Sequence, residues 1–174
     1  NVRDLWDKNY SETRLPGVPS TIIEMLSHQS FPDMLLAHDP NFKFNMARAL
    51  YKGIAKFVCQ SHGEKCVIAP LPPRSLAVTM DHKGKAKISW KETVDTLESS
   101  AKPTSYILYT AVGNGGYDNG QVVKSNVVTM NLGSETLYRF RVTAINRGGE
   151  SLPSEEMCAY FHPMAREQVL VVNG

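Results

Sequence analysis

One carboxylate stands inside an apolar run near the start of the chain. In STIIEML, residues 20–26, Glu24 follows two isoleucines and precedes Met25 and Leu26. A carboxylate buried without a partner is costly. At the carboxyl end of a strand in an open α/β sheet, a glutamate faces a cleft instead and can act as a general base. The alternative is a strand-end carboxylate that is solvated or paired with a nearby Lys or Arg.

The other residue types that support chemistry are scattered. The histidines have no HExxH spacing and form no cluster of three ligands, so the sequence predicts neither catalytic zinc nor another cofactor in this chain. They are His28, His38, His62, His82 and His162. Asp118 and Asn119 lie in VGNGGYDNGQ, which lacks the glycine order of a phosphate-binding loop and is expected to be a hairpin loop. Tyr109 and Tyr117 are either ordinary surface residues or a stacking platform for a sugar ring.

The cysteines leave two alternatives open. Cys59, Cys66 and Cys158 have no CxxC spacing, which argues against a zinc ribbon or a redox pair of that kind. Cys59 and Cys66 bracket the short segment QSHGEK. They could form a disulfide in an oxidising compartment, or all three could be ordinary reduced thiols.

Composition excludes several classes of protein. The 174 residues, 42% of them hydrophobic, suffice for one domain or for a small domain with a piece of another. A net charge of +2, spread along the chain, favours neither nucleic acid nor an acidic membrane surface. The sequence has no apolar run of membrane-spanning length and no signal-peptide pattern. The chain opens on Asn1 and closes on VLVVNG, and we interpret it as a segment of a longer protein.

Residues 1–66 have helical character with one apolar strand. Asp39 and Pro40 are an N-cap followed by proline at the first helical position, and an amphipathic helix of about four turns is expected after them. Its apolar stripe is predicted to contain Phe42, Met46, Leu50, Gly53 and Phe57, with Lys43, Arg48, Lys52 and Lys56 away from it. STIIEML resembles a strand buried on both faces, as in parallel sheets flanked by helices. Residues 1–66 are therefore predicted to be the last strand–helix unit of an α/β domain, whose exposed apolar surface would favour self-association.

The sequence changes character near PLPPR, residues 70–74. Short segments with period-two alternation follow, separated by the turn signals HKGK, VGNGGYDNG and NRGGES. The expected strands are SLAVTM, AKISW, SYILYTA, VVKSNVVTMN, LYRFRVTAI and MCAYF. This spacing predicts a mainly β fold, an antiparallel β-sandwich.

Several markers make this half similar to a fibronectin type III domain, an immunoglobulin-like sandwich. PLPPRSLAVTM stands where such a domain begins, and Trp90 ends the second strand. Leu132 and Tyr138 have the spacing of that family's tyrosine corner, in which the phenol bonds back to the backbone of the corner. The resemblance implies that residues 67–161 are one complete module. Residues 162–174 are expected to be a linker and the first strand of a following domain.

The segment from Val18 to Val58 resembles the C-terminal end of a zinc-dependent N-acetylmuramoyl-L-alanine amidase. In that family a proline and an apolar strand lead to a glutamate, then to a loop with a short helix and to a long helix. The matching glutamate is the catalytic one, so the resemblance implies that Glu24 is a general base. The family's zinc ligands lie upstream of this motif, which puts the metal in the parent enzyme and not in this chain.

Together the two resemblances predict a secreted, periplasmic or cell-surface protein that acts on peptidoglycan or another cell-surface glycan. This chain would carry the end of the amidase-like domain and a spacer module, and would not be active alone. Proteins with this arrangement are often called xanthan lyases, but no pattern here indicates elimination chemistry. The alternative is a non-catalytic module for binding or adhesion that recognises a glycan or a protein.

Overall fold

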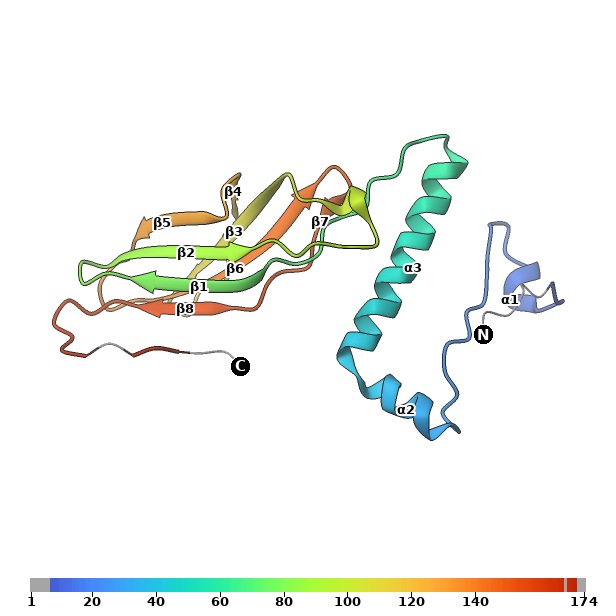
Figure 1. The fold of residues 1–174 in the computed structure, drawn as a ribbon, viewed down its shortest axis with the longest axis horizontal. Coiled ribbons are helices and arrows are strands. Elements are labelled where there is room, and N and C mark those ends of the chain that lie inside the picture. The colour runs from blue at the N-terminus through green and yellow to red at the C-terminus, as the bar shows by residue number, and fades with distance from the viewer. Residues whose placement is uncertain (1–6, 168, 172–174) are drawn as a thin grey trace. The chain divides into compact units, whose positions relative to one another are not determined.

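The computed structural model describes residues 7–167 and 169–171. Figure 1 shows a helical N-terminal part followed by two layers of strands. The chain divides into two compact units, Asn1–Tyr51 and Lys52–Gly174. The helices are α1 (Ser11–Arg14), α2 (Phe31–His38) and α3 (Pro40–Ser61). No described helix is both long enough and apolar enough to span a membrane.

The first unit has no buried side chain among its described residues. α3 begins where the sequence predicts, because the Asp39 carboxylate accepts the N–H of Asn41 at 2.9 Å and Pro40 occupies the first position. It runs for 22 residues, longer than the expected four turns. The predicted strand STIIEML is wrong for this structure, in which residues 20–26 belong to no strand. A strand needs a hydrogen-bonded neighbour, and no described segment pairs with this one.

The second unit holds the last residues of α3 and two antiparallel sheets. One sheet has the order β1-β2-β5, and the other has the order β4-β3-β6-β7 with β8 also paired to β6. The strands are β1 (Arg74–Met80), β2 (Lys85–Lys91), β3 (Ser105–Val112), β4 (Gln121–Val123), β5 (Val127–Asn131), β6 (Leu137–Asn146), β7 (Gly149–Glu150) and β8 (Met157–Tyr160), with a short 3₁₀ helix η1 (Ser99–Ala101) between β2 and β3. The predicted antiparallel sandwich is confirmed.

Alternating side chains of both sheets form the core between the layers. On β6, Phe140, Val142 and Ala144 are buried, as the period-two pattern predicts. The ring of Trp90 meets that of Tyr106 edge-on, with centroids 5.5 Å apart. The buried residues of this core are Leu76, Ala86, Ile88, Trp90, Tyr106, Leu108, Leu132, Phe140, Val142 and Ala144.

The turn into the last strand is held by two serine side chains. Ser151 Oγ accepts the N–H of Ala144 at 2.9 Å, and Ser154 Oγ accepts the N–H of Val142 at 3.0 Å. The backbone N–H groups of the same serines donate to the carbonyls of Ala144 and Val142, each at 2.8 Å, so both the backbone and the side chains bond to β6 between β7 and β8. In the expected following segment, the described residues of 162–174 form no strand, and Gln168 and residues 172–174 lie outside the described part.

Candidate functional site

Glu24 lies on an irregular segment between α1 and α2. The glutamate is exposed, and Ile22, Ile23 and Met25 around it are each about half exposed (46%, 51% and 51%). Within residues 7–167 and 169–171 the Glu24 carboxylate makes no hydrogen bond or ion pair. The carboxylate is therefore solvated in this structure. The catalytic role that the amidase resemblance implies stays a prediction.

The described residues do not fit a zinc site. No group of three or more His, Cys, Asp or Glu side chains in the described ranges could hold a metal ion. Among the described residues, the closest approach of a histidine to a carboxylate is that of His162 Nε2 to Glu135 Oε1, at 3.5 Å, and both residues are far from Glu24 in sequence. No chemical step through a metal is assigned to this chain.

The outer face of the β3–β6 sheet carries a cluster that we call the tyrosine–arginine surface. It consists of Tyr109, Tyr117, Arg139, Arg141, Glu150 and Glu156. The guanidinium of Arg141 lies 4.0 Å from the ring centroid of Tyr117 and 5.4 Å from that of Tyr109. Arg139 lies 5.8 Å from the Tyr117 ring. Cation–π contacts of this kind fix both partners in place.

Two glutamates complete the tyrosine–arginine surface. Tyr109 Oη donates to Glu150 Oε1 at 2.7 Å, and Thr143 Oγ1 donates to the same oxygen at 2.7 Å. Tyr117 Oη donates to Glu156. Burial, followed by the hydrogen bond to Glu156, raises the pKa of Tyr117 to about 12, and the bond to Glu150 is the largest cause of the raised pKa of Tyr109. Both phenols are therefore neutral hydrogen-bond donors near neutral pH.

The glycine-rich loop holds Tyr117 over the sheet. Asp118 Oδ1 accepts the N–H groups of Thr110 and Gly120 at 3.1 and 3.0 Å, and the N–H of Asp118 bonds to the carbonyl of Thr110. An added Cβ at Gly120 would lie 2.3 Å from Ile107, and its φ is +78°. Asp118 therefore supports the loop as a hydrogen-bond acceptor.

A second polar cluster, the helix joint, lies between the end of α3 and the loop before η1. Lys52 Nζ lies 2.7 Å from Asp95 Oδ2, and Lys56 Nζ lies 2.6 Å from Glu98 Oε2. Both acidic side chains are nearly buried, with exposed fractions of 8% and 10%. The polar side of α3 thus contacts the sandwich in this unit. The predicted apolar stripe is wrong at its C-terminal end, because Phe57 is 54% exposed.

The tyrosine corner is present as the resemblance implied. Tyr138 Oη accepts the N–H of Gly133 at 3.0 Å, and Leu132 is buried beneath the corner. The period-two pattern of β6 also predicts the outward direction of Arg139 and Arg141. It contained no signal that Glu150 and Glu156 would reach Tyr109 and Tyr117, since those contacts depend on the path of the chain between β6 and β8.

The chain is similar to several solved structures, and the first of these, at a TM-score of 0.50, supports the fold. A human domain described as the fourth FNIII domain has 24% identity and a TM-score of 0.50, over 60% of this chain and 88% of that chain. The domain of human fibronectin type III domain containing protein 3 has 25% identity and a TM-score of 0.45, over 57% and 92%. "Titin kinase and its flanking domains" has 27% identity and a TM-score of 0.47, and this chain covers 18% of it. This chain therefore spans less than a fifth of the titin kinase structure.

Two further comparisons concern the sequence. A search of curated proteins found no match. The fibronectin type III domain profile matches residues 71–158, just over half of the 174 residues. The match runs from before β1 to the second residue of β8 and includes the tyrosine corner. The chain therefore belongs to the fibronectin type III domain family.

Proposed function

We propose that this chain is part of a multidomain hydrolase directed at the cell wall, in which the fibronectin type III module is a spacer. Residues 1–66 would be the C-terminal part of an amidase-like α/β domain, with Glu24 as its general base. Residues 162–174 would lead into a following domain. The parent would be secreted, periplasmic or on the cell surface and would act on peptidoglycan. Its zinc ligands would come from residues outside this chain.

The exposed apolar side chains before the module carry this proposal. Ile23, Phe31 and Leu35 are at least half exposed, although an ordinary domain buries residues of these types. The same holds for Ile54 and Phe57 on α3, at 65% and 54%. Large apolar side chains that remain this exposed support the presence of a structure that covers them. If the amidase resemblance holds, the other strands of the α/β domain would cover these side chains.

The helix joint supports the spacer role. α3 belongs to the amidase-like segment by resemblance, yet its last turns are paired through Lys52 and Lys56 with acidic residues of the sandwich. Two ion pairs with nearly buried carboxylates resist rotation of the helix end on the module. A spacer attached through such a joint would hold its neighbours at a defined separation, unlike a flexible linker.

The experiment compares this chain with a longer chain in which the proposed remainder of the amidase-like domain precedes Asn1. We expect the longer chain to release stem peptides from purified peptidoglycan and this chain to release none. Glu24→Gln in the longer chain should lower kcat by about 10²–10⁴-fold, the usual contribution of a general base. Glu64→Gln changes another exposed glutamate and should leave kcat unchanged. Full activity of the Glu24→Gln enzyme, or an inactive longer chain, would overturn the proposal.

The tyrosine–arginine surface favours a second candidate, a non-catalytic module that binds a glycan or a protein. Tyr and Arg dominate the residues that contribute most to binding interfaces. Here Arg141 holds both tyrosine rings, so little side-chain entropy remains to be lost on binding.

Cosedimentation of this chain with insoluble peptidoglycan tests the binding candidate. Tyr117→Ala and Arg141→Ala should each reduce the bound fraction, whereas Tyr160→Ala, which removes an exposed tyrosine of β8, should not. Equal binding by all three variants would exclude this surface as a peptidoglycan-binding site.

A further inference from the structure

Two cysteine side chains meet where α3 ends. Cys59 lies in the last turn of α3, and Cys66 lies in the segment that leads to β1. Their sulfur atoms are 2.7 Å apart, and both residues are half-buried. Cys158, the third cysteine, is exposed on β8. Cys59 and Cys66 are therefore close enough to react with each other, whereas Cys158 lies elsewhere, on β8.

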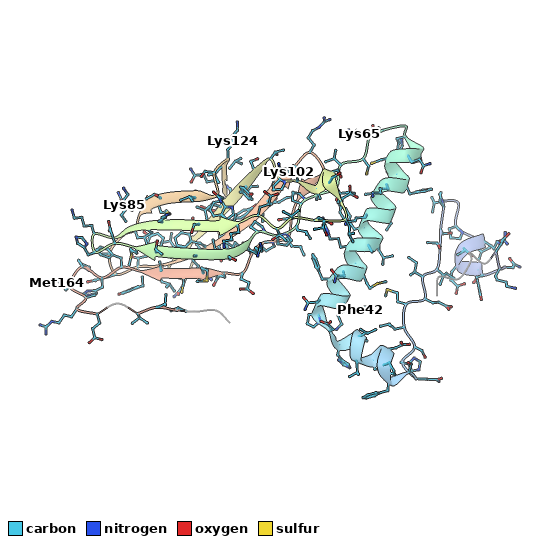
Figure 2. All side chains as sticks on the ribbon, viewed as in Figure 1. Phe42, Lys65, Lys85, Lys102, Lys124 and Met164 are labelled. Atoms are coloured by element: carbon cyan, nitrogen blue, oxygen red, sulfur yellow. The ribbon has the colours of Figure 1, made fainter. Side chains whose placement is uncertain are left out.

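The local backbone explains why the two sulfurs meet. Gly63 has a φ of +67°, the left-handed conformation that ends many helices. The N–H of Gly63 bonds to the carbonyl of Gln60, and the N–H of Glu64 bonds to the carbonyl of Cys59 at 2.8 Å. These bonds turn the chain back along the last turn of the helix. Lys65, labelled in Figure 2, follows this turn, and Cys66 comes next.

The segment after Cys66 is fixed to the sandwich. Ile68 is fully buried, and its N–H bonds to Ser100 Oγ at 3.1 Å. Its carbonyl accepts the side-chain N–H of Asn146, at the end of β6, at 2.9 Å. Cys66 is thus two residues from a firm anchor on the module, while Cys59 belongs to the helix. A bond between the two would add a second covalent link between the helix and the module, besides the backbone of residues 60–65.

We propose that Cys59 and Cys66 are the site of a reversible disulfide that fastens the end of α3 to the fibronectin type III module. The sulfurs need to approach by less than an ångström to reach the bond length of about 2.05 Å. This proposal does not depend on the hydrolase assignment. It adds a covalent element to the helix joint, whose other contacts are the pairs Lys52–Asp95 and Lys56–Glu98.

The oxidation balances with a low-molecular-weight disulfide as the oxidant. One cysteine thiolate attacks that disulfide, forms a mixed disulfide and releases one small thiol. The thiolate of the other cysteine then attacks the protein sulfur of the mixed disulfide and releases the second small thiol. The two protein thiols lose two protons and two electrons, and one small disulfide is reduced to two thiols.

The first test uses the full 174-residue chain carrying Cys158→Ser, incubated in oxidised or reduced glutathione. The hydrogen bond with Cys59, followed by burial, raises the pKa of the Cys66 thiol, so exchange is run at mildly alkaline pH to supply thiolate. Free thiols are then alkylated, and the protein is digested with trypsin. Cleavage after Lys56, Lys65 and Arg74 separates residues 57–65 from 66–74 unless a disulfide joins them.

We expect one mass for the joined peptides after oxidation and two alkylated peptides after reduction. Cys59→Ser and Cys66→Ser chains should instead carry one glutathione on the remaining cysteine. Two alkylated peptides after oxidation, or glutathione on both cysteines of the Cys158→Ser chain, would overturn the proposal.

Hydrogen exchange supplies a second, independent measurement on the same samples. A closed disulfide limits local opening of the helix end, so amides of residues 52–61 should exchange about tenfold more slowly in the oxidised chain. Amides of β2 and β6, in the core of the module, should exchange equally in both forms. Identical exchange of residues 52–61 in the joined and reduced chains would show that the bond does not fasten the helix.

Discussion

Lys52 of α3 and Asp95 of the loop before η1 form the more buried of the two ion pairs at the helix joint. Nζ lies 2.7 Å from Oδ2, and the side chains are 17% and 8% exposed. The other carboxylate oxygen of Asp95 accepts the N–H of Leu97, so the loop also depends on this residue. The pair thus ties the position of the helix end to the conformation of the loop.

Replacing Lys52 should destabilise the module. Lys52→Met removes the 2.7 Å ion pair with the nearly buried Asp95 carboxylate, which should lower the free energy of unfolding by about 1–3 kcal/mol. Urea denaturation followed by tryptophan fluorescence measures this change. Lys43→Met, at an exposed lysine earlier on the same helix, is the matched control and should change stability little. Equal midpoints for the two variants would mean that the pair contributes nothing.

The Lys56–Glu98 pair makes stability depend on pH at both ends of the range. The hydrogen bond with Lys56, followed by that from Ser100, lowers the pKa of Glu98, and the bond to Glu98 raises the pKa of Lys56. The contribution of Glu98 is complete above its unfolded pKa and is lost as pH falls through its lowered folded pKa. The contribution of Lys56 is complete below its unfolded pKa and is lost as pH rises through its raised folded pKa.

Glu98→Gln should therefore lower Tm near neutral pH, and its difference from the unchanged chain should shrink and then disappear as pH falls through the lowered folded pKa of Glu98. Thermal unfolding of both chains across this range measures the difference. Glu64→Gln, at an exposed glutamate, should follow the unchanged chain at every pH. A Tm difference for Glu98→Gln that persists undiminished at the acidic end would contradict the ion-pair explanation.

Tyr138 should stabilise the module through its phenol as well as its ring. Tyr138→Phe keeps the ring, which lies 6.3 Å from that of Phe140, and removes the acceptor for the N–H of Gly133. The expected loss is about 0.5–1.5 kcal/mol, the usual net value of one hydrogen bond. Tyr160→Phe removes a half-exposed phenol and should be near neutral. A loss in Tyr138→Phe no larger than in Tyr160→Phe would show that the corner bond is not stabilising.

The sandwich could be predicted from sequence because each of its main signals is local. The alternation in β6 places Phe140 and Val142 inside, and the spacing of Leu132 and Tyr138 predicts the corner. A side chain on a strand points to one of two faces, so a short pattern decides its environment. Most strands of the second half consequently appear close to where the sequence predicts them. The expected single strand VVKSNVVTMN is wrong, because it is divided into β4 and β5, which belong to different sheets.

The contacts of the helix joint and the absence of a strand at STIIEML could not be predicted in the same way. The apolar pattern of α3 predicts that the helix packs through the face that contains Phe57. The contact with the module is instead made by Lys52 and Lys56, whose acidic partners are about forty residues away in the sequence. STIIEML has the composition of a buried strand, yet a strand exists only beside another strand. Glu24 therefore lies on a segment that pairs with no described strand, although its composition predicts one.

Gly148 should tolerate no side chain, because the chain approaches it closely. A Cβ at this position would lie 2.3 Å from the carbonyl oxygen of Val67 and 2.8 Å from the carbonyl carbon of Ile68. Both contacts are backbone atoms of the anchored segment before β1, so Gly148→Ala forces either that segment or the turn after β6 to move. The expected loss is about 1–3 kcal/mol, which corresponds to a fall in Tm of at least about 4 °C.

Gly116→Ala provides the matched control for this prediction. No atom outside its immediate neighbours lies within 4 Å of a Cβ at Gly116, and its φ is not in the left-handed region, so the same substitution should leave Tm nearly unchanged. Differential scanning calorimetry of the two variants measures the difference directly. If the two variants have the same Tm, the segment before β1 can move away without a loss of stability. The close packing around Ile68, which positions Cys66, would then not be a rigid anchor.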